Sequence, residues 1–133
     1  MTKLAFKNVL VVFFIILMFP LISFAEETAT GKLEGLMCLM HHKECSHAKL
    51  DPHLMFEHDF VLLLSNGEYY LLPNIPRDVK IQHIHDELKV TGTVNKKFNA
   101  MDVSELQVKK DGKYETVWSK KLLEEAYKNN QYK

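Results

Sequence analysis

Leu88-Lys-Val-Thr-Gly-Thr-Val-Asn95 is the stretch that decides the fold, because two classes of residue alternate along it without interruption. The leucine, the valines and the glycine fall on one face, whereas the lysine, the threonines and the asparagine fall on the other. This period of two is typical of a half-buried antiparallel strand. Less regular alternation predicts further strands at residues 32–40, 56–65, 68–72, 101–109 and 114–118.

Two dipeptides predict how these strands are joined. Asn66-Gly67 stands between two predicted strands and is a strong signal for a two-residue hairpin. Asp111-Gly112 is a second hairpin signal, and it indicates that residues 114–118 fold back as an extra strand. The chain therefore contains at least two antiparallel pairs that are local in sequence.

Breaks in the alternation predict irregular places in the strands. Apolar residues change face around Gly35 and again between Val103 and Leu106, which indicates a β-bulge or sharp bend at each place. Residues 77–87 carry isolated apolar residues among charged ones and predict a short helix or an irregular crossover.

The end of the chain changes from strand to helix periodicity. Leucines, an alanine and a tyrosine recur at helical spacing in residues 119–133, and Ser119 is a suitable N-cap. We expect this helix to dock on the strands, with a partner-binding helix as the alternative. Residues 26–31 are small, polar and acidic, and predict a flexible lead-in.

The N-terminus has the features of a secretory signal peptide over residues 1–25. Lys3 and Lys7 precede an apolar run from Val9 to Phe19, and Ser23-Phe24-Ala25 has the small residues of a cleavage site. An uncleaved anchor is the alternative, but the apolar run is short for a membrane span. The sequence therefore predicts a periplasmic or secreted protein with no stable membrane span after cleavage.

Residues 26–133 suffice for one small domain with a modest core. The whole chain has 17 basic and 17 acidic residues, and loss of two lysines with the signal peptide leaves 15 minus 17, a formal charge of −2. A slightly acidic domain of this kind gives no reason to expect nucleic acid as a partner.

The predicted order of elements is a bent first strand, a hairpin, a short crossover and two more strands. This is the order of the OB-fold, a five-stranded Greek-key barrel. The sequence thus predicts a mainly β protein, with an OB-like five-stranded Greek-key barrel and its extra hairpin strand at residues 32–118, and a C-terminal helix and tail at residues 119–133.

Several stretches resemble small secreted bacterial OB-like proteins of poorly defined function. The resemblance spans about residues 31–109 and rests on the following features: Gly31-Lys-Leu-Glu-Gly35, then Cys38, Cys45 and His47, then Asn66-Gly67-Glu68-Tyr69-Tyr70-Leu71-Leu72, and Leu88-Lys-Val-Thr-Gly-Thr-Val94. It implies an OB-like fold and a binding role. It also implies a cysteine and histidine group between the first two strands.

Residues 37–47, Met-Cys-Leu-Met-His-His-Lys-Glu-Cys-Ser-His, concentrate the soft and borderline metal ligands of the chain. Thiolate, thioether and imidazole are the side chains that Zn(II) and Cu(I) select. The candidate ligands are Cys38, His41, His42, Cys45 and His47, together with His58 at the start of the second predicted strand. The six-residue gap between the cysteines departs from the usual zinc spacing, whereas Cu(I) accepts fewer ligands, and Met37 or Met40 could join them.

A disulfide between Cys38 and Cys45 is the alternative use of the same residues, because secreted proteins fold under oxidising conditions. It would make the chain a disulfide-stapled OB-fold interaction module that binds an envelope protein or a saccharide. The chain has neither a nucleophile elbow nor a glycine-rich phosphate loop, which favours a non-enzymatic role. His83 and His85 receive no ligand role.

Overall fold

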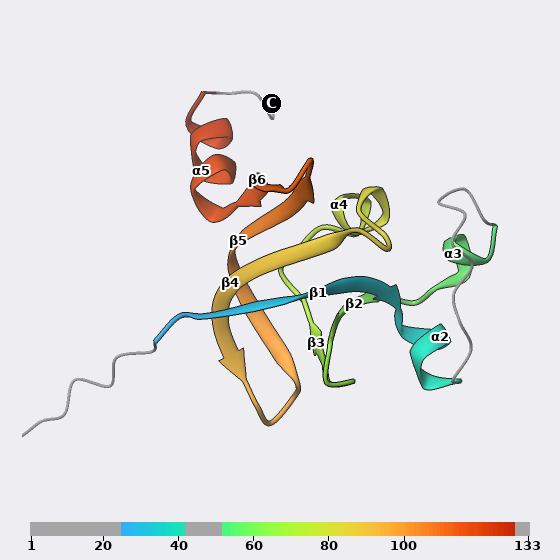
Figure 1. Ribbon diagram of the computed structural model, residues 1–133. Helices are drawn as coiled ribbons and strands as arrows, with labels where there is room; N and C mark the ends of the chain where they lie inside the picture. The colour runs from blue at the N-terminus through green and yellow to red at the C-terminus, as the bar shows by residue number, and fades with distance from the viewer. Residues whose placement is uncertain (1–24, 42–51, 130–133) are drawn as a thin grey trace, which may run out of the picture.

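Six strands form the body of the protein. The computed structural model describes residues 25–41 and 52–129. The strands are β1 (Glu27–Gly35), β2 (Phe60–Leu64), β3 (Tyr69–Leu71), β4 (Glu87–Asn95), β5 (Ala100–Lys110) and β6 (Lys113–Ser119) (Figure 1). The helices are α2 (Leu36–Met40), α3 (His53–Phe56), α4 (Arg77–Gln82) and α5 (Lys120–Lys128). The prediction of a mainly β protein with a C-terminal helix is confirmed.

All six strands belong to one sheet in the order β3-β2-β1-β4-β5-β6, with antiparallel neighbours. One additional parallel pairing joins β3 to β5 at Leu71 and Ala100. The pairings therefore lead from β1 through β2, β3, β5 and β4 back to β1, while β6 adds to the outer side of β5. Asn74, after β3, reinforces this link because its side-chain amide bonds both Val103 N and Val103 O at 2.9 and 2.7 Å.

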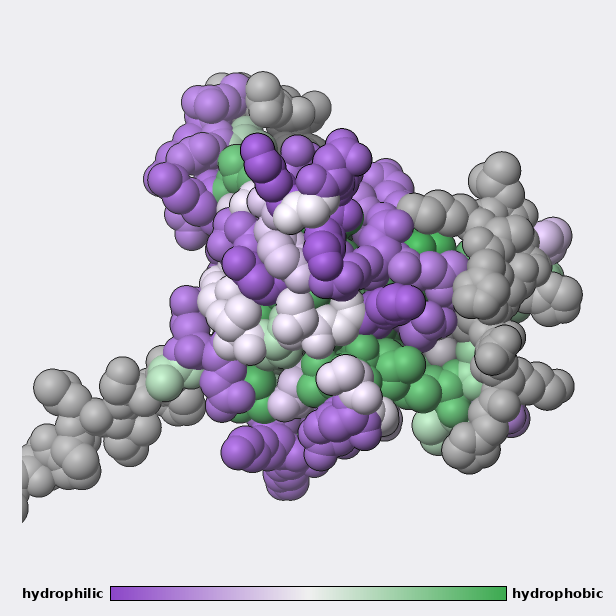
Figure 2. Space-filling view, viewed as in Figure 1, coloured by the Kyte–Doolittle hydropathy of each residue, from purple (hydrophilic) through white to green (hydrophobic). Residues whose placement is uncertain are grey.

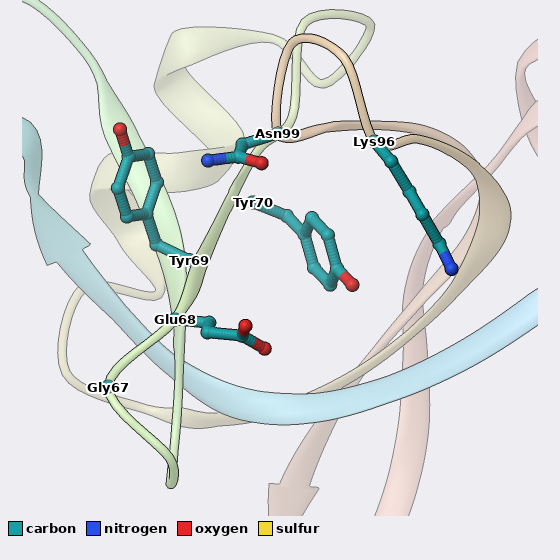
Figure 3. A pocket seen from close by; sticks show the side chains of 6 residues that line it. All are labelled: Gly67, Glu68, Tyr69, Tyr70, Lys96 and Asn99. Atoms are coloured by element: carbon teal, nitrogen blue, oxygen red, sulfur yellow. The ribbon is translucent and has the colours of Figure 1, made fainter.

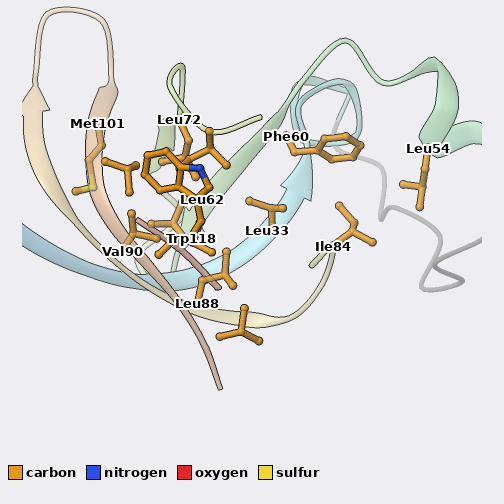
Figure 4. Close-up of a cluster of buried hydrophobic side chains, with 14 residues drawn as sticks. Leu33, Leu54, Phe60, Leu62, Leu72, Ile84, Leu88, Val90, Met101 and Trp118 are labelled. Atoms are coloured by element: carbon orange, nitrogen blue, oxygen red, sulfur yellow. The ribbon is translucent and has the colours of Figure 1, made fainter. Parts of the chain in front are cut away.

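The core lies on the inward face of these strands (Figure 4). Phe60 and Leu62 from β2 pack there with buried residues of β1, β4, β5 and β6, and Leu72 just beyond β3 joins them. From β3 itself, the partly buried Tyr70 packs against this core. Each fully buried large apolar side chain contributes about 1.5–3 kcal/mol relative to an exposed one. The residues of β4 with the cleanest alternation, Leu88 and Val90, are fully buried, as their pattern predicts.

The predicted irregularities of β5 and the last hairpin are confirmed. The register between β4 and β5 skips one residue, Ser104, which places the bulge between Val103 and Leu106. Asp111 and Gly112 both have positive φ, 48° and 79°, as a hairpin turn between β5 and β6 requires. Ser119 caps α5, because its hydroxyl accepts the backbone N–H of Leu122 at 3.1 Å.

The first hairpin has a longer loop than predicted. Gly67 N donates to Leu64 O at 3.0 Å, and Leu64 N donates to Glu68 O at 2.8 Å. The loop is therefore three residues, 65–67, and closes with a glycine at φ 85°. A single left-handed residue next to a type I turn produces this bulged hairpin, whereas the two-residue type I′ turn needs two left-handed residues.

The N-terminal boundaries also differ from the predictions. β1 begins at Glu27, inside the predicted lead-in, because its first half pairs with β4. Residues 36–40 form helix α2 and do not continue β1 through a bulge at Gly35. Leucine and methionine are good helix formers, so this segment satisfies either pattern by sequence alone. None of the helices in residues 25–41 and 52–129 is long and apolar enough to cross a membrane.

Candidate functional site

Helix α2 carries the first residues of the predicted metal-binding segment, and Glu57 holds its start in place. The Glu57 carboxylate accepts the backbone N–H of Met37 at 2.8 Å, and its other oxygen lies 3.1 Å from Sγ of Cys38. Only 8 % of Glu57 is exposed. A carboxylate at this position satisfies a helix N–H that has no partner within the helix, so Glu57 fixes the turn that presents Cys38.

The structure describes three of the six predicted ligands. Cys38 lies in α2, His41 follows directly after it, and His58 lies in the segment between α3 and β2. His42, Cys45 and His47 lie outside the described residues. Within residues 25–41 and 52–129, no group of three or more His, Cys, Asp or Glu side chains could hold a metal ion.

Cys38 is not a free cysteine in the structure. Cys45, which is the other cysteine of the chain, lies outside the described residues. The Cys38–Cys45 bridge therefore stays a prediction, as does a metal site that uses the same two side chains.

Strand alternation extended back from Phe60 predicts that His58 also faces the core, and this prediction is wrong. His58 is exposed, and Glu57 is the buried residue that lies against α2. The reason is that β2 begins only at Phe60, so strand alternation does not extend back to residue 58. Before the strand begins, hydrogen bonds decide which polar side chain is buried. Here Glu57 is the residue that makes them, with α2.

Asp59, two residues after Glu57, connects the start of β2 to α4, the helix between β3 and β4. Its carboxylate accepts the backbone N–H of Phe60 at 2.8 Å and pairs with Nζ of Lys80 at 2.7 Å. The Lys80 side chain is 3 % exposed and that of Asp59 is 34 % exposed. This ion pair ties α4 to the start of β2.

His83 and His85 each have a carboxylate partner at Nδ1. His83 lies 3.2 Å from Asp86, and His85 lies 3.2 Å from Glu34 of β1. The contact of His85 joins the end of the crossover to β1, and the contact of His83 lies within the turn that follows α4. They give both histidines a structural role.

A pocket of about 520 Å³ lies where β3 meets the turn between β4 and β5 (Figure 3). Its lining consists of Gly67, Glu68, Tyr69, Tyr70, Lys96 and Asn99. The backbone brings the two sides together, because Leu71 N donates to Asn99 O at 2.7 Å. Asn99 has a φ of 47°, which turns the chain back into β5.

The polar groups of the pocket differ in how they are held. Glu68 is held by Asn66, whose side-chain amide donates to the carboxylate at 2.7 Å. Within the described part of the chain, Lys96 has no ion pair, and the hydroxyls of Tyr69 and Tyr70 have no hydrogen-bond partner. Figure 3 shows the ring of Tyr70 on the side of Lys96 and that of Tyr69 pointing away from it. The pocket thus offers aromatic surface, one ammonium group, neutral polar groups and the carboxylate of Glu68.

A second polar group lies on the outer surface of β4, β5 and β6. Glu87 accepts a hydrogen bond of 2.7 Å from the hydroxyl of Tyr114 and forms an ion pair with Lys109 at 3.0 Å. These two partners lower the pKa of Glu87, mainly through the Tyr114 hydrogen bond. The same bond raises the pKa of Tyr114, and the Glu87 carboxylate raises that of Lys109. The group is open to solvent and ties three strands together at the surface.

Sequence reasoning missed both Glu57 and the pocket. Strand alternation extended back from Phe60 places residue 57 on the solvent face, so the sequence alone predicts an ordinary solvated charge at Glu57. The two tyrosines after Asn66-Gly67 are a sequence signal for the pocket. Adjacent strand residues point to opposite faces, so this strand carries an aromatic side chain on each face. The turn that completes the pocket comes from residues about 25 positions later, and only the pairing of β3 with β5 brings it there.

Comparison with known proteins gave no match: no protein-family model, curated protein or solved structure is significantly similar to the chain.

Proposed function

We propose that the chain is a periplasmic or secreted, non-enzymatic binding module with an OB-like barrel, and that it binds a saccharide in the pocket beside β3. The ring of strand pairings from β1 to β5, with a helix between β3 and β4, supports the OB-like barrel. OB-folds bind ligands on the surface of the second and third strands and on the loop before the fifth, which is the place of this pocket.

The pocket carries the proposal because its size suits a small ligand. Its volume of about 520 Å³ lies within the 300–1,000 Å³ range of small-molecule sites. A sugar presents apolar C–H faces and many hydroxyls, and on the side of Lys96 the pocket offers the ring and hydroxyl of Tyr70 and an asparagine amide. A protein partner would require a larger contact area than this pocket provides.

The charge at the pocket favours an acidic saccharide. Lys96 supplies a positive charge that no carboxylate neutralises within the described residues. The carboxylate of Glu68 also lines the pocket, and it accepts a hydrogen bond of 2.7 Å from the side-chain amide of Asn66. We therefore assign the sugar carboxylate to Lys96 and the hydroxyls to Asn99 and Tyr70.

Titration calorimetry with glucuronic acid and glucose tests this proposal. The wild-type protein should prefer glucuronic acid by roughly two- to fivefold, which corresponds to an exposed ion pair of about 0.5–1 kcal/mol. Lys96→Gln should abolish this preference. Lys97→Gln is the matched control, because the neighbouring ammonium lies over the ring of Phe98, 5.2 Å from its centre, and does not line the pocket.

Equal affinity of wild type and Lys96→Gln for glucuronic acid would refute the assignment of the carboxylate. Absence of binding by either sugar, in a protein with intact thermal unfolding, would refute the saccharide proposal and favour a protein partner.

We propose metal binding through the cysteine and histidine segment as the second candidate, because Cys38, His41, His42, Cys45 and His47 lie so close in sequence. It excludes the disulfide, since both uses require the same two sulfur atoms. Native mass spectrometry with and without a chelator tests it. A Zn(II) or Cu(I) adduct that disappears in Cys38→Ser and Cys45→Ser supports it, whereas a chain two hydrogens lighter with no metal supports the disulfide.

A further inference from the structure

Helix α2 presents sulfur atoms on the side where a surface helix normally presents polar groups. Leu36 and Leu39 are partly buried, whereas Met37 is 36 % exposed and Met40 is 61 % exposed. A surface helix usually turns its charged residues to solvent. Figure 1 places α2 at the end of the molecule opposite α5, and none of the residues of α2 is fully buried.

These methionines share one face of the turn with His41. The backbone N–H of His41 donates to Met37 O at 3.0 Å, so residues 37–41 complete one helical turn. Residues three and four apart on a turn are neighbours, with Cβ atoms about 5–6 Å apart. Met40 and His41 therefore lie next to Met37, which brings two thioethers and one imidazole together.

Glu57 fixes this turn at its first residues, as its carboxylate accepts Met37 N at 2.8 Å. The turn is thus held by the fold, while its outer side chains stay open to solvent. Figure 2 shows apolar surface continuing to this end of the molecule beside the grey atoms. The combination of a fixed turn and accessible soft ligands is what a metal site needs.

We propose that Met37, Met40 and His41 bind one Cu(I) ion. Cu(I) selects thioether and imidazole ligands and accepts a low coordination number, whereas zinc favours thiolate, imidazole and carboxylate. This set needs no thiolate, so it agrees with a Cys38 that is not a free cysteine. The site goes beyond the saccharide proposal. It shares His41 with the second candidate function but uses two methionine thioethers in place of the cysteines.

Competition titration tests the site with Cu(I) in ascorbate against the chromogenic chelator bicinchoninate, and with Zn(II) in parallel. The wild-type protein should take one Cu(I) from the chelator. Met37→Leu and Met40→Leu keep side-chain volume and remove the sulfur, so each should weaken Cu(I) binding by roughly tenfold or more. Zn(II) binding should not depend on either methionine.

Met55→Leu is the matched control, because this methionine of α3 is 79 % exposed and does not belong to the turn. It should leave Cu(I) affinity unchanged, and so should the double variant Cys38→Ser, Cys45→Ser. Full affinity in Met37→Leu and Met40→Leu with loss in the cysteine variant would overturn this site in favour of the cysteine and histidine segment. No Cu(I) uptake by wild type would overturn this site and leave the saccharide proposal standing.

Discussion

The ion pair between Lys80 and Asp59 predicts an asymmetry between its two single substitutions. Asp59→Asn keeps the acceptor for Phe60 N but leaves an ammonium group whose side chain is only 3 % exposed. Removing one partner of a buried pair costs about 3–5 kcal/mol, and the partial exposure of Asp59 reduces this to about 2–3 kcal/mol. Lys80→Met leaves a carboxylate that is 34 % exposed and still bonded to Phe60 N, so we expect a cost below about 1 kcal/mol.

Urea unfolding of both single variants and the double variant measures this asymmetry. The double variant Asp59→Asn, Lys80→Met should resemble Lys80→Met alone, because the isolated buried charge is then absent. The coupling between the two sites should therefore equal most of the cost of Asp59→Asn. A larger loss of stability in Lys80→Met than in Asp59→Asn would refute the argument that burial of the ammonium group dominates this contact.

Three further substitutions test other parts of the structure. Gly92→Ala should prevent folding or lower the unfolding temperature strongly, because the added Cβ would clash with the carbonyl oxygen of Asp102 across the bulge; a variant with wild-type circular dichroism and melting would contradict this. Glu87→Gln should lower the pKa of Tyr114 toward its ordinary value, and phenolate absorbance measures this pKa. Because the pKa of Tyr114 is raised in the folded protein, its hydrogen bond to Glu87 stabilises the fold below about pH 10, and this stabilisation is lost as pH rises through the folded pKa. An unchanged titration of Tyr114 in the variant would contradict this prediction. Ser119→Ala should destabilise α5 by about 1 kcal/mol in chemical unfolding, whereas Ser119→Asp should retain the cap.

Local patterns predicted the parts of the fold that depend on neighbouring residues. The alternation of β4, the bulge between Val103 and Leu106, the turn at Asp111-Gly112 and the cap at Ser119 each follow from a few adjacent side chains. Such features depend on backbone conformation and on which face is buried, so they can be predicted from the sequence.

The failures come from contacts between distant segments. Residues 36–40 are compatible with a strand or a helix. The helix is favoured by hydrogen bonds that Leu36 N donates to Asp59 O and Met37 N donates to the Glu57 carboxylate. The pocket depends on the pairing of Leu71 with Ala100, which no local pattern indicates. The candidate metal ligands can be recognised from the residue types in the sequence, but their arrangement in space depends on where α2 ends.

The saccharide proposal is tested most directly by mapping the binding of glucuronic acid on the backbone amides with ¹H–¹⁵N NMR. The proposal predicts saturable shift changes in residues 67–70 and 96–99, which come from the two sides of the pocket, and little change in α2 or α5. Changes confined to other surfaces, or no saturable change at all in the folded protein, would contradict it.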